Sequence, residues 1–420
     1  MDGTRHRAGA GVSGAVRSAA GRLSGFTVSV GVVTLIGIIS IPLLTASLGK
    51  TTWGTLALIQ TVSQFGGILV AFGWGATGAA TVAGIPIEGR QAFYRTSLRA
   101  RALLYLLVFP VIAVILALLI RGDVLVSVLG AAVYLLPNLG AAWYFTGEGK
   151  PLRLLLCDTL PTVLGAVVGI VGAVLTGELW VYLVAQGLGF VGAVVIDAVT
   201  VLRGSSASPH PRVPLRVVLG GQRHAVSATL VSGLYVTLPM VAVQAFLPAL
   251  QPMYAVADRL FKYASIALLP IQQFFQGWVP DPEADYRHRA RIAAGAAVVI
   301  GIIGGACIAV LSPWASTILS VGAITVPWEV SLPLGIAFIG IATAAIVGYA
   351  CLVVVGRVRA LAVSTLIGAL VGAPLILLFA AAGSAPAVAW AVAVSELCVA
   401  GYQVLVLRAE LRRPAKEAAS

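Results

Sequence analysis

Long apolar stretches alternate with short polar breaks along the whole chain. Most stretches contain about 20 residues, the length at which an α-helix crosses the hydrocarbon core of a bilayer. Their apolar residues are continuous rather than alternating, which favours helices over a membrane β-barrel. Twelve spans are predicted, at residues 26–47, 53–84, 102–120, 124–145, 154–175, 179–202, 225–247, 251–278, 292–311, 330–355, 360–381 and 385–407, with an interfacial connector at 312–329.

The longest polar break, RGSSASPHPRVPLRVVLGGQRH at 203–224, divides these spans into two sets of six. Because each set is even, both sets enter the membrane in the same direction. We therefore predict an all-α polytopic membrane protein with about 12 transmembrane helices in two six-helix bundles around a central cavity. The N-terminal bundle covers 1–202 with a basic cytoplasmic segment at 1–25. A cytoplasmic linker covers 203–224, and the C-terminal bundle covers 225–420 with a basic cytoplasmic tail.

Composition supports the membrane class, with 59% hydrophobic residues, 10% charged residues and a mean hydropathy of +1.01. The net charge of +12 follows from topology, because all but four of the 27 Lys and Arg residues lie on one side if the N-terminus is cytoplasmic. We therefore expect both termini in the cytoplasm and no nucleic-acid partner. The four cysteines are isolated in apolar runs, which indicates neither a metal site nor a disulfide framework.

The eighth span, at 251–278, carries charged residues where the other spans are apolar. Asp258, Arg259 and Lys262 lie two turns in from its start. Each charge facing lipid at the centre of a helix would cost roughly 2.5–3.5 kcal/mol, so these side chains must face the protein or a cavity. Asp258 and Lys262 have the i,i+4 spacing of an ion pair. Arg259 has no such partner in its own helix, which predicts a site for an anion.

Other polar residues inside spans are candidates for the same cavity. Gln60 and Gln64 share a face of the second span. Gln272, with Gln273 and Gln276, either lines the cytoplasmic half of the cavity or marks the exit of the eighth span. Glu396, near the middle of the twelfth span, is either a proton or cation site, a structural partner of Arg259, or a helix–helix hydrogen-bonding group.

Two acids, Asp158 and Asp197, lie near span ends, where they can reach the interface in a structural role.

The sequences GWGATG at 73–78 and GLGFVG at 187–192 match a dinucleotide-binding pattern. That pattern needs a strand and a soluble βαβ unit. Both lie in membrane spans, where small residues let helices approach closely, and we interpret them as packing motifs.

Two segments resemble bacterial polysaccharide and O-antigen flippases of the multidrug/oligosaccharidyl-lipid/polysaccharide exporter superfamily. They are the run from 23 to 84, beginning LSGFTVSVGVVTLIG, and YAVADRLFKYASIALLPIQQFFQGWVP at 254–280. The resemblance implies translocation of an undecaprenyl-pyrophosphate-linked oligosaccharide across the bacterial plasma membrane, for cell-surface polysaccharide biosynthesis. It maps the basic pyrophosphate-holding residues of the family onto Arg259 and Lys262. Unlike better-studied relatives, this chain has no Arg or Lys within its first two spans.

We expect alternating access, with Asp258 and Glu396 as sites where a counter-moving H⁺ or Na⁺ biases the cycle, and no other cofactor. Expected partners are the lipid-linked oligosaccharide, membrane lipids, and the polymerase and glycosyltransferases of the same pathway. A cation-coupled multidrug exporter of the same superfamily is an alternative, although its cavity should be dominated by acids. A membrane enzyme acting on lipid-linked sugars is disfavoured, because the longest outer loop, 312–329, holds only Glu329 as an acid. We therefore predict a transporter and not an enzyme, with no catalytic residues.

Overall fold

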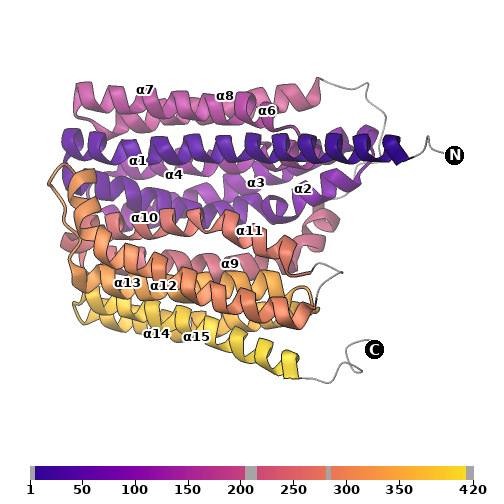
Figure 1. The fold of residues 1–420 in the computed structure, drawn as a ribbon. Helices are drawn as coiled ribbons and strands as arrows, with labels where there is room; N and C mark the ends of the chain where they lie inside the picture. The colour runs from indigo at the N-terminus through magenta and orange to yellow at the C-terminus, as the bar shows by residue number, and fades with distance from the viewer. Residues whose placement is uncertain (1–4, 204–214, 281–284, 413–420) are drawn as a thin grey trace. The chain divides into compact units, whose positions relative to one another are not determined.

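The computed structural model describes residues 5–203, 215–280 and 285–412, and the regular structure in these ranges is helical (Figure 1). The first helices are α1 (Arg5–Ala71), α2 (Trp74–Gly84), α3 (Ile87–Ile120), α4 (Val124–Leu135), α5 (Ala142–Glu148), α6 (Pro151–Arg153), α7 (Leu160–Thr176) and α8 (Leu179–Leu202). They are followed by α9 (Leu215–Phe246), α10 (Gln251–Ala267), α11 (Leu269–Trp278), α12 (Tyr286–Leu319), α13 (Trp328–Ile346), α14 (Val358–Ala381) and α15 (Ala385–Arg412). Short 3₁₀ turns at Leu136–Leu139 and Pro248–Leu250 and π-helical turns at Leu154–Thr159 and Val347–Leu352 complete the set.

Ten helical segments in the described ranges are long and apolar enough to cross a membrane. One of them, Val28–Ala71, contains two spans, because Gly49 (φ 82°, ψ 161°) breaks the helix between them. Helices α10 and α11, with 17 and 10 residues, are too short to cross singly, and together they form the predicted eighth span. The all-α fold with twelve spans is therefore confirmed.

Helix boundaries differ from the predicted ones where charged residues lie within a helix. Helix α3 begins at Ile87, so the residues before the predicted third span, among them Arg90, Arg95 and Arg99, are helical. Helix α9 begins at Leu215, inside the stretch predicted as a linker, while 204–214 lies outside the described residues, as do 1–4 of the N-terminal segment and 413–420 of the tail. Helix α12 continues to Leu319 and takes up part of the predicted connector. A helical backbone satisfies its own hydrogen bonds, so a polar side chain does not end it.

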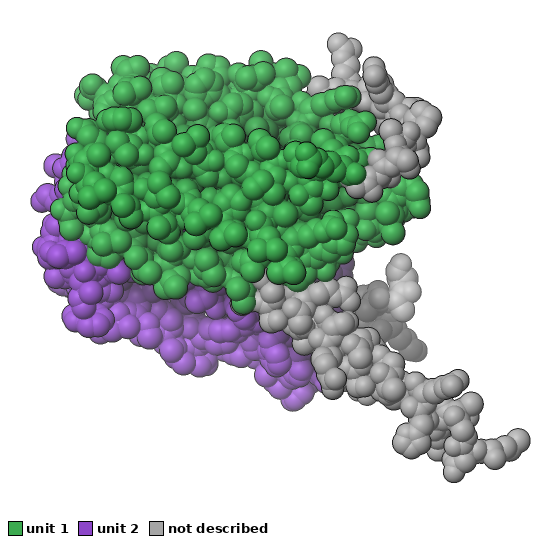
Figure 2. Space-filling view, turned by 90° about the horizontal axis from the view of Figure 1, so that it is seen from above, with its two compact units in different colours: residues 1–48, 62–229 green, residues 49–61, 230–420 purple. Residues whose placement is uncertain are grey.

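The chain divides into two compact units (Figure 2). Unit 1 contains residues 1–48 and 62–229, and unit 2 contains residues 49–61 and 230–420. The start of the second predicted span, 49–61, thus packs with unit 2, while the rest of that span belongs to unit 1. The domain boundaries proposed from the sequence remain a prediction.

Unit 1 packs through small residues at helix crossings. A Cβ atom on Gly189 of α8 would lie 2.7 Å from the Cα of Gly165 on α7 and 2.7 Å from the carbonyl oxygen of Pro161. Gly78 of α2 faces the ring of Trp143, 2.5 Å from the place of its Cβ. Both glycine-rich motifs therefore contain glycines at close contacts, in agreement with the packing interpretation.

This packing predicts different effects for two glycines of one motif. Gly189→Ala places a methyl group against the backbone of α7, and we expect a loss of roughly 1–3 kcal/mol in stability. In Gly192→Ala the new Cβ meets only Pro161 Cβ, at an ordinary 3.8 Å, so the higher helix propensity of alanine should leave stability equal or higher. Thermal unfolding in detergent measures both variants. Equal melting temperatures for the two would contradict the packing role of Gly189.

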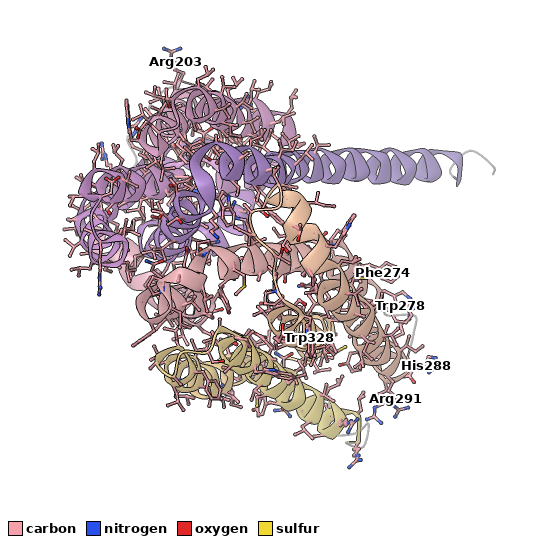
Figure 3. The ribbon with its side chains drawn as sticks, turned by 90° about the vertical axis from the view of Figure 1, so that its left-hand side faces the viewer. Arg203, Phe274, Trp278, His288, Arg291 and Trp328 are labelled. Carbon is pink, nitrogen blue, oxygen red and sulfur yellow. The ribbon has the colours of Figure 1, made fainter. Side chains whose placement is uncertain are left out.

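Unit 2 packs in the same way around α13. Gly305 of α12 and Gly335 of α13 approach so closely that a Cβ on either would overlap the other's carbonyl oxygen. At the far end of α11, Phe274 and Trp278 stack with ring centroids 6.4 Å apart (Figure 3). Arg289 of α12 lies over the Trp278 ring at 5.0 Å and donates to its carbonyl oxygen at 2.6 Å. These contacts fix α11 against α12.

Candidate functional site

The charged span is a discontinuous helix. Pro252 lies in the first turn of α10, where no backbone donor is needed, and Pro270 lies at the start of α11, where its missing N–H interrupts the helical ladder. The Nε2 atom of the buried Gln251 donates to the carbonyl oxygen of Gly54 at 2.9 Å. This bond attaches the start of α10 to segment 49–61 of the same unit.

Asp258 and Lys262 form the ion pair expected from their spacing. Lys262 Nζ lies 2.7 Å from Asp258 Oδ2, and the side chains are 30% and 17% exposed. Each charge is therefore largely neutralised by the other within one turn of α10. The predicted pairing is confirmed, and Lys262 is left with a smaller share of free positive charge than the sequence suggests.

Arg259 has a different environment. Its guanidinium carbon lies 5.4 Å from the ring centroid of Trp53, which is completely buried. The phenol of Tyr263, one turn further along α10, lies within interaction range. The structure shows no ion pair for Arg259 in the described ranges, and its side chain is half-buried. A guanidinium stacked on an indole presents its N–H groups at its edge, so besides the interaction with Tyr263 it has further donors for an acceptor.

The predicted glutamines belong to two helices and to both units. Gln60 is half-buried in segment 49–61 of unit 2, whereas Gln64 is exposed and belongs to unit 1. Gln272 is half-buried on α11, beyond the interruption at Pro270. Their roles in substrate binding remain predictions.

Glu396 is held at a crossing of three helices in unit 2. A Cβ atom on Gly340 of α13 would lie 2.6 Å from the carbonyl carbon of Glu396, and the Oγ atom of Ser395 donates to the carbonyl oxygen of Gly368 on α14 at 2.8 Å. The hydroxyl of the buried Tyr235 lies within interaction range of the carboxylate, without a well-formed hydrogen bond. The described residues include no basic partner for Glu396, and a pair with Arg259 is not formed.

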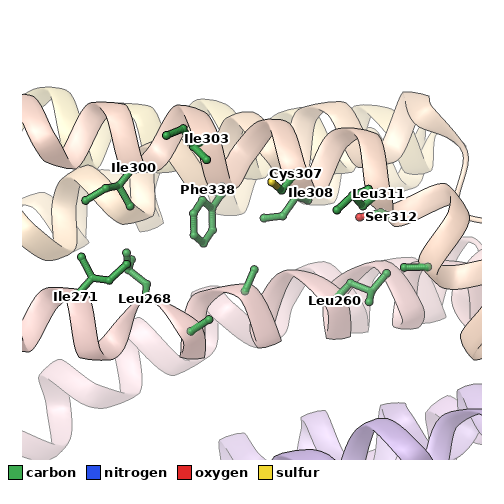
Figure 4. A pocket seen from close by; sticks show the side chains of 14 residues that line it. Leu260, Leu268, Ile271, Ile300, Ile303, Cys307, Ile308, Leu311, Ser312 and Phe338 are labelled. Carbon is green, nitrogen blue, oxygen red and sulfur yellow. The ribbon is translucent and has the colours of Figure 1, made fainter.

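An apolar pocket lies beside α10 (Figure 4). It has a volume of about 500 Å³ and opens between one side of α10 and α11, including Leu260 and Ile271, and one side of α12, with Phe338 of α13 in its middle. Of its lining residues only Ser312 and Cys307 carry a polar side-chain atom. The pocket therefore suits a hydrocarbon chain rather than a charged or sugar group.

Sequence reasoning missed a polar network in unit 1. Arg101, counted with the basic residues of a cytoplasmic loop, is 1% exposed, and Asp197, expected to reach the interface, is fully buried. Asp197 Oδ2 accepts from the backbone N–H of Ala141 at 2.7 Å, while Asp158 is half-buried nearby. The one sequence feature that points to this network is the i,i+4 spacing of Ser97 and Arg101, which are joined by a 3.0 Å hydrogen bond.

No protein-family model matches the chain, and no curated protein matches it in sequence. Among solved structures it is similar to a multidrug resistance transporter of the MATE family, of the MOP superfamily, in an inward-facing conformation. That similarity has 16% identity, covers 90% of this chain and 94% of the other, and has a TM-score of 0.67. It is also similar to the lipid II flippase MurJ in an inward closed conformation, with 12% identity, 94% and 89% coverage and a TM-score of 0.67. These identities show the fold alone, and the chain has the twelve-helix fold of the MATE transporters and MurJ.

Proposed function

We propose that the protein is a flippase that moves an undecaprenyl-pyrophosphate-linked oligosaccharide across the bacterial plasma membrane by alternating access. The observation that carries this proposal is Arg259, a guanidinium that forms no ion pair with the described residues and is stacked on Trp53 beside a neutralised Asp258–Lys262 pair. The cluster has a net positive charge inside a span, so it favours an anion. A pyrophosphate linkage offers several charged oxygens to the free edge of the guanidinium.

The apolar pocket beside α10 supports a lipid-linked substrate. Leu260 lines that pocket and directly follows Arg259 in the chain. A substrate with a charged linkage and a long hydrocarbon chain could place the linkage at Arg259 and the chain in the pocket. A small hydrophilic anion would make no use of this apolar surface.

The other residues predicted from the sequence take the remaining roles in this proposal. Glu396 is the half-buried acid that carries the coupling cation, because Asp258 is already paired with Lys262. Gln60, Gln64 and Gln272 contact the sugar headgroup. The partners are the enzymes that make and polymerise the oligosaccharide, with both termini in the cytoplasm.

A second function, export of organic cations, is favoured by Glu396 and by the similarity to a multidrug resistance transporter. A cationic substrate would be attracted to Glu396 on α15 and repelled by Arg259. This alternative therefore uses the same fold with a different binding residue.

Purified protein in proteoliposomes tests the two functions directly. We expect a fluorescent undecaprenyl-pyrophosphate oligosaccharide to become accessible on the opposite face, at a rate at least ten times that of protein-free liposomes. An organic cation such as ethidium should not be transported. Ethidium transport without movement of the lipid-linked sugar would replace the flippase with the drug exporter, and movement of neither would refute both.

A further inference from the structure

Three residues that line a pocket in unit 1 carry a buried hydrogen-bond donor that has no acceptor among the described residues. The pocket has a volume of about 350 Å³ and lies where two spans are interrupted: at the junction of α1 and α2, and at the turn between α4 and α5. Interrupted helices expose backbone groups that a continuous helix would satisfy, and membrane transporters use such places to bind polar ligands.

Arg101 is the one ionisable residue in the wall of this pocket. Its Nε atom donates to Ser97, and its Nη1 atom donates to the carbonyl oxygens of Asn138 and Gly140 at 2.7 and 2.8 Å. Its Nη2 atom is buried and has no acceptor in the part of the chain that the structure describes. Asp158 and Asp197 lie near Gly140 but do not line the pocket. Asp197 is close enough to Arg101 to interact with its charge, but neither acid forms an ion pair with Arg101 within the described residues. A buried charge with an unused donor favours an anionic ligand.

Further donors surround the same space. The indole nitrogens of Trp74 and Trp143, both in the pocket wall, are buried without an acceptor, and an indole N–H can only donate. Trp74 and Gly75 are also the first residues of α2, an 11-residue helix whose N-cap provides no side-chain hydrogen bond. The first N–H groups of a helix are unsatisfied and carry a partial positive charge.

We propose that this pocket binds a phosphate group. Residues with a guanidinium donor, two indole donors and a helix N-terminus line the pocket from different elements. A phosphate has enough oxygens to accept from several donors, whereas a carboxylate has two. The source is either a soluble phosphate or the headgroup of an anionic phospholipid. The site belongs to unit 1, so it goes beyond the function proposed for Arg259 in unit 2.

The test measures binding in the Arg259→Ala background, which removes the anion site of unit 2. One arm titrates inorganic pyrophosphate by calorimetry into protein in phosphatidylcholine nanodiscs. The other measures by native mass spectrometry how much phosphatidylglycerol the protein retains from a mixture with phosphatidylcholine. Gly75→Leu adds a side chain at a residue that lines the pocket, where a Cβ meets no atom within 4 Å. Gly84→Leu is the matched control, on the same helix, with equally open space and outside the pocket.

We expect binding in one arm, weakened at least tenfold by Gly75→Leu and by Arg101→Gln and unchanged by Gly84→Leu. Pyrophosphate binding would identify a soluble phosphate, and selective retention of phosphatidylglycerol would identify a lipid headgroup. If neither binds, or if Gly75→Leu binds as well as Gly84→Leu, the proposal is overturned. Gly75→Leu keeps the test decisive if Arg101→Gln fails to fold, because it leaves every hydrogen bond of Arg101 in place.

Discussion

Replacing Arg259 with alanine should reduce translocation of the lipid-linked oligosaccharide by about 10- to 100-fold. A hydrogen bond to a charged group contributes about 1.5–3 kcal/mol, and about 1.4 kcal/mol corresponds to a factor of ten. Stability should fall little, because the guanidinium has no ion pair in the described part of the chain and its stacking partner Trp53 stays buried among other residues. The initial rate of the proteoliposome assay measures the effect. Arg259→Lys should give an intermediate rate, since it keeps the charge but loses the planar fork.

Two comparisons separate the role of Arg259 from a general loss of positive charge. Arg291→Ala removes an exposed arginine from the same unit and should leave the rate unchanged. The double variant Asp258→Ala/Lys262→Ala removes a pair whose charges cancel, so it should keep the rate within about tenfold of wild type, whereas a single change would leave the other charge unpaired. A wild-type rate for folded Arg259→Ala would rule out the anion site. A loss in the double variant as large as in Arg259→Ala would give Lys262 an equal part in binding.

The part of this site that could be predicted is the part that depends on local sequence. Twelve spans follow from the lengths of the apolar runs, and the pairing of Asp258 with Lys262 follows from helical geometry. The environment of Arg259 does not follow from local sequence, because its stacking partner Trp53 lies many spans earlier in the chain. The sequence shows a charge without a local partner, and only the fold shows that an indole supports it.

Arg101 is a second residue whose environment could not be predicted from the sequence. In sequence it continues a run of arginines, and a hydropathy average counts its charge against a span wherever its side chain points. Its burial depends on carbonyl groups 37 and 39 residues away, which become available only because the chain turns between α4 and α5. The turn between α4 and α5 thus allows Arg101 of α3 to be buried, and no local sequence pattern predicts both features.

Glu396→Gln should abolish acceleration of transport by an ion gradient while leaving gradient-free exchange of substrate in place. Glutamine keeps the volume of the side chain, so the close contacts of α15 with Gly340 and Gly368 persist. The substitution removes the negative charge. An acid without a basic partner inside a span destabilises the protein by roughly 2.5–3.5 kcal/mol, and its presence despite this cost indicates a functional role. Transport with and without an imposed H⁺ or Na⁺ gradient, measured in the same liposomes, gives the ratio that the charge controls.

The matched control is Glu329→Gln, the same substitution at an exposed acid in the first turn of α13. It should respond to the gradient as the wild type does. If Glu396 only fills space or accepts a hydrogen bond from its surroundings, the glutamine variant will be accelerated as much as the control, and the coupling role must be assigned elsewhere. If both variants lose the response, the gradient acts through surface charge rather than through α15. If Glu396→Gln alone loses acceleration by the gradient and still exchanges substrate without a gradient, Glu396 is the acid whose charge is used once per transport cycle.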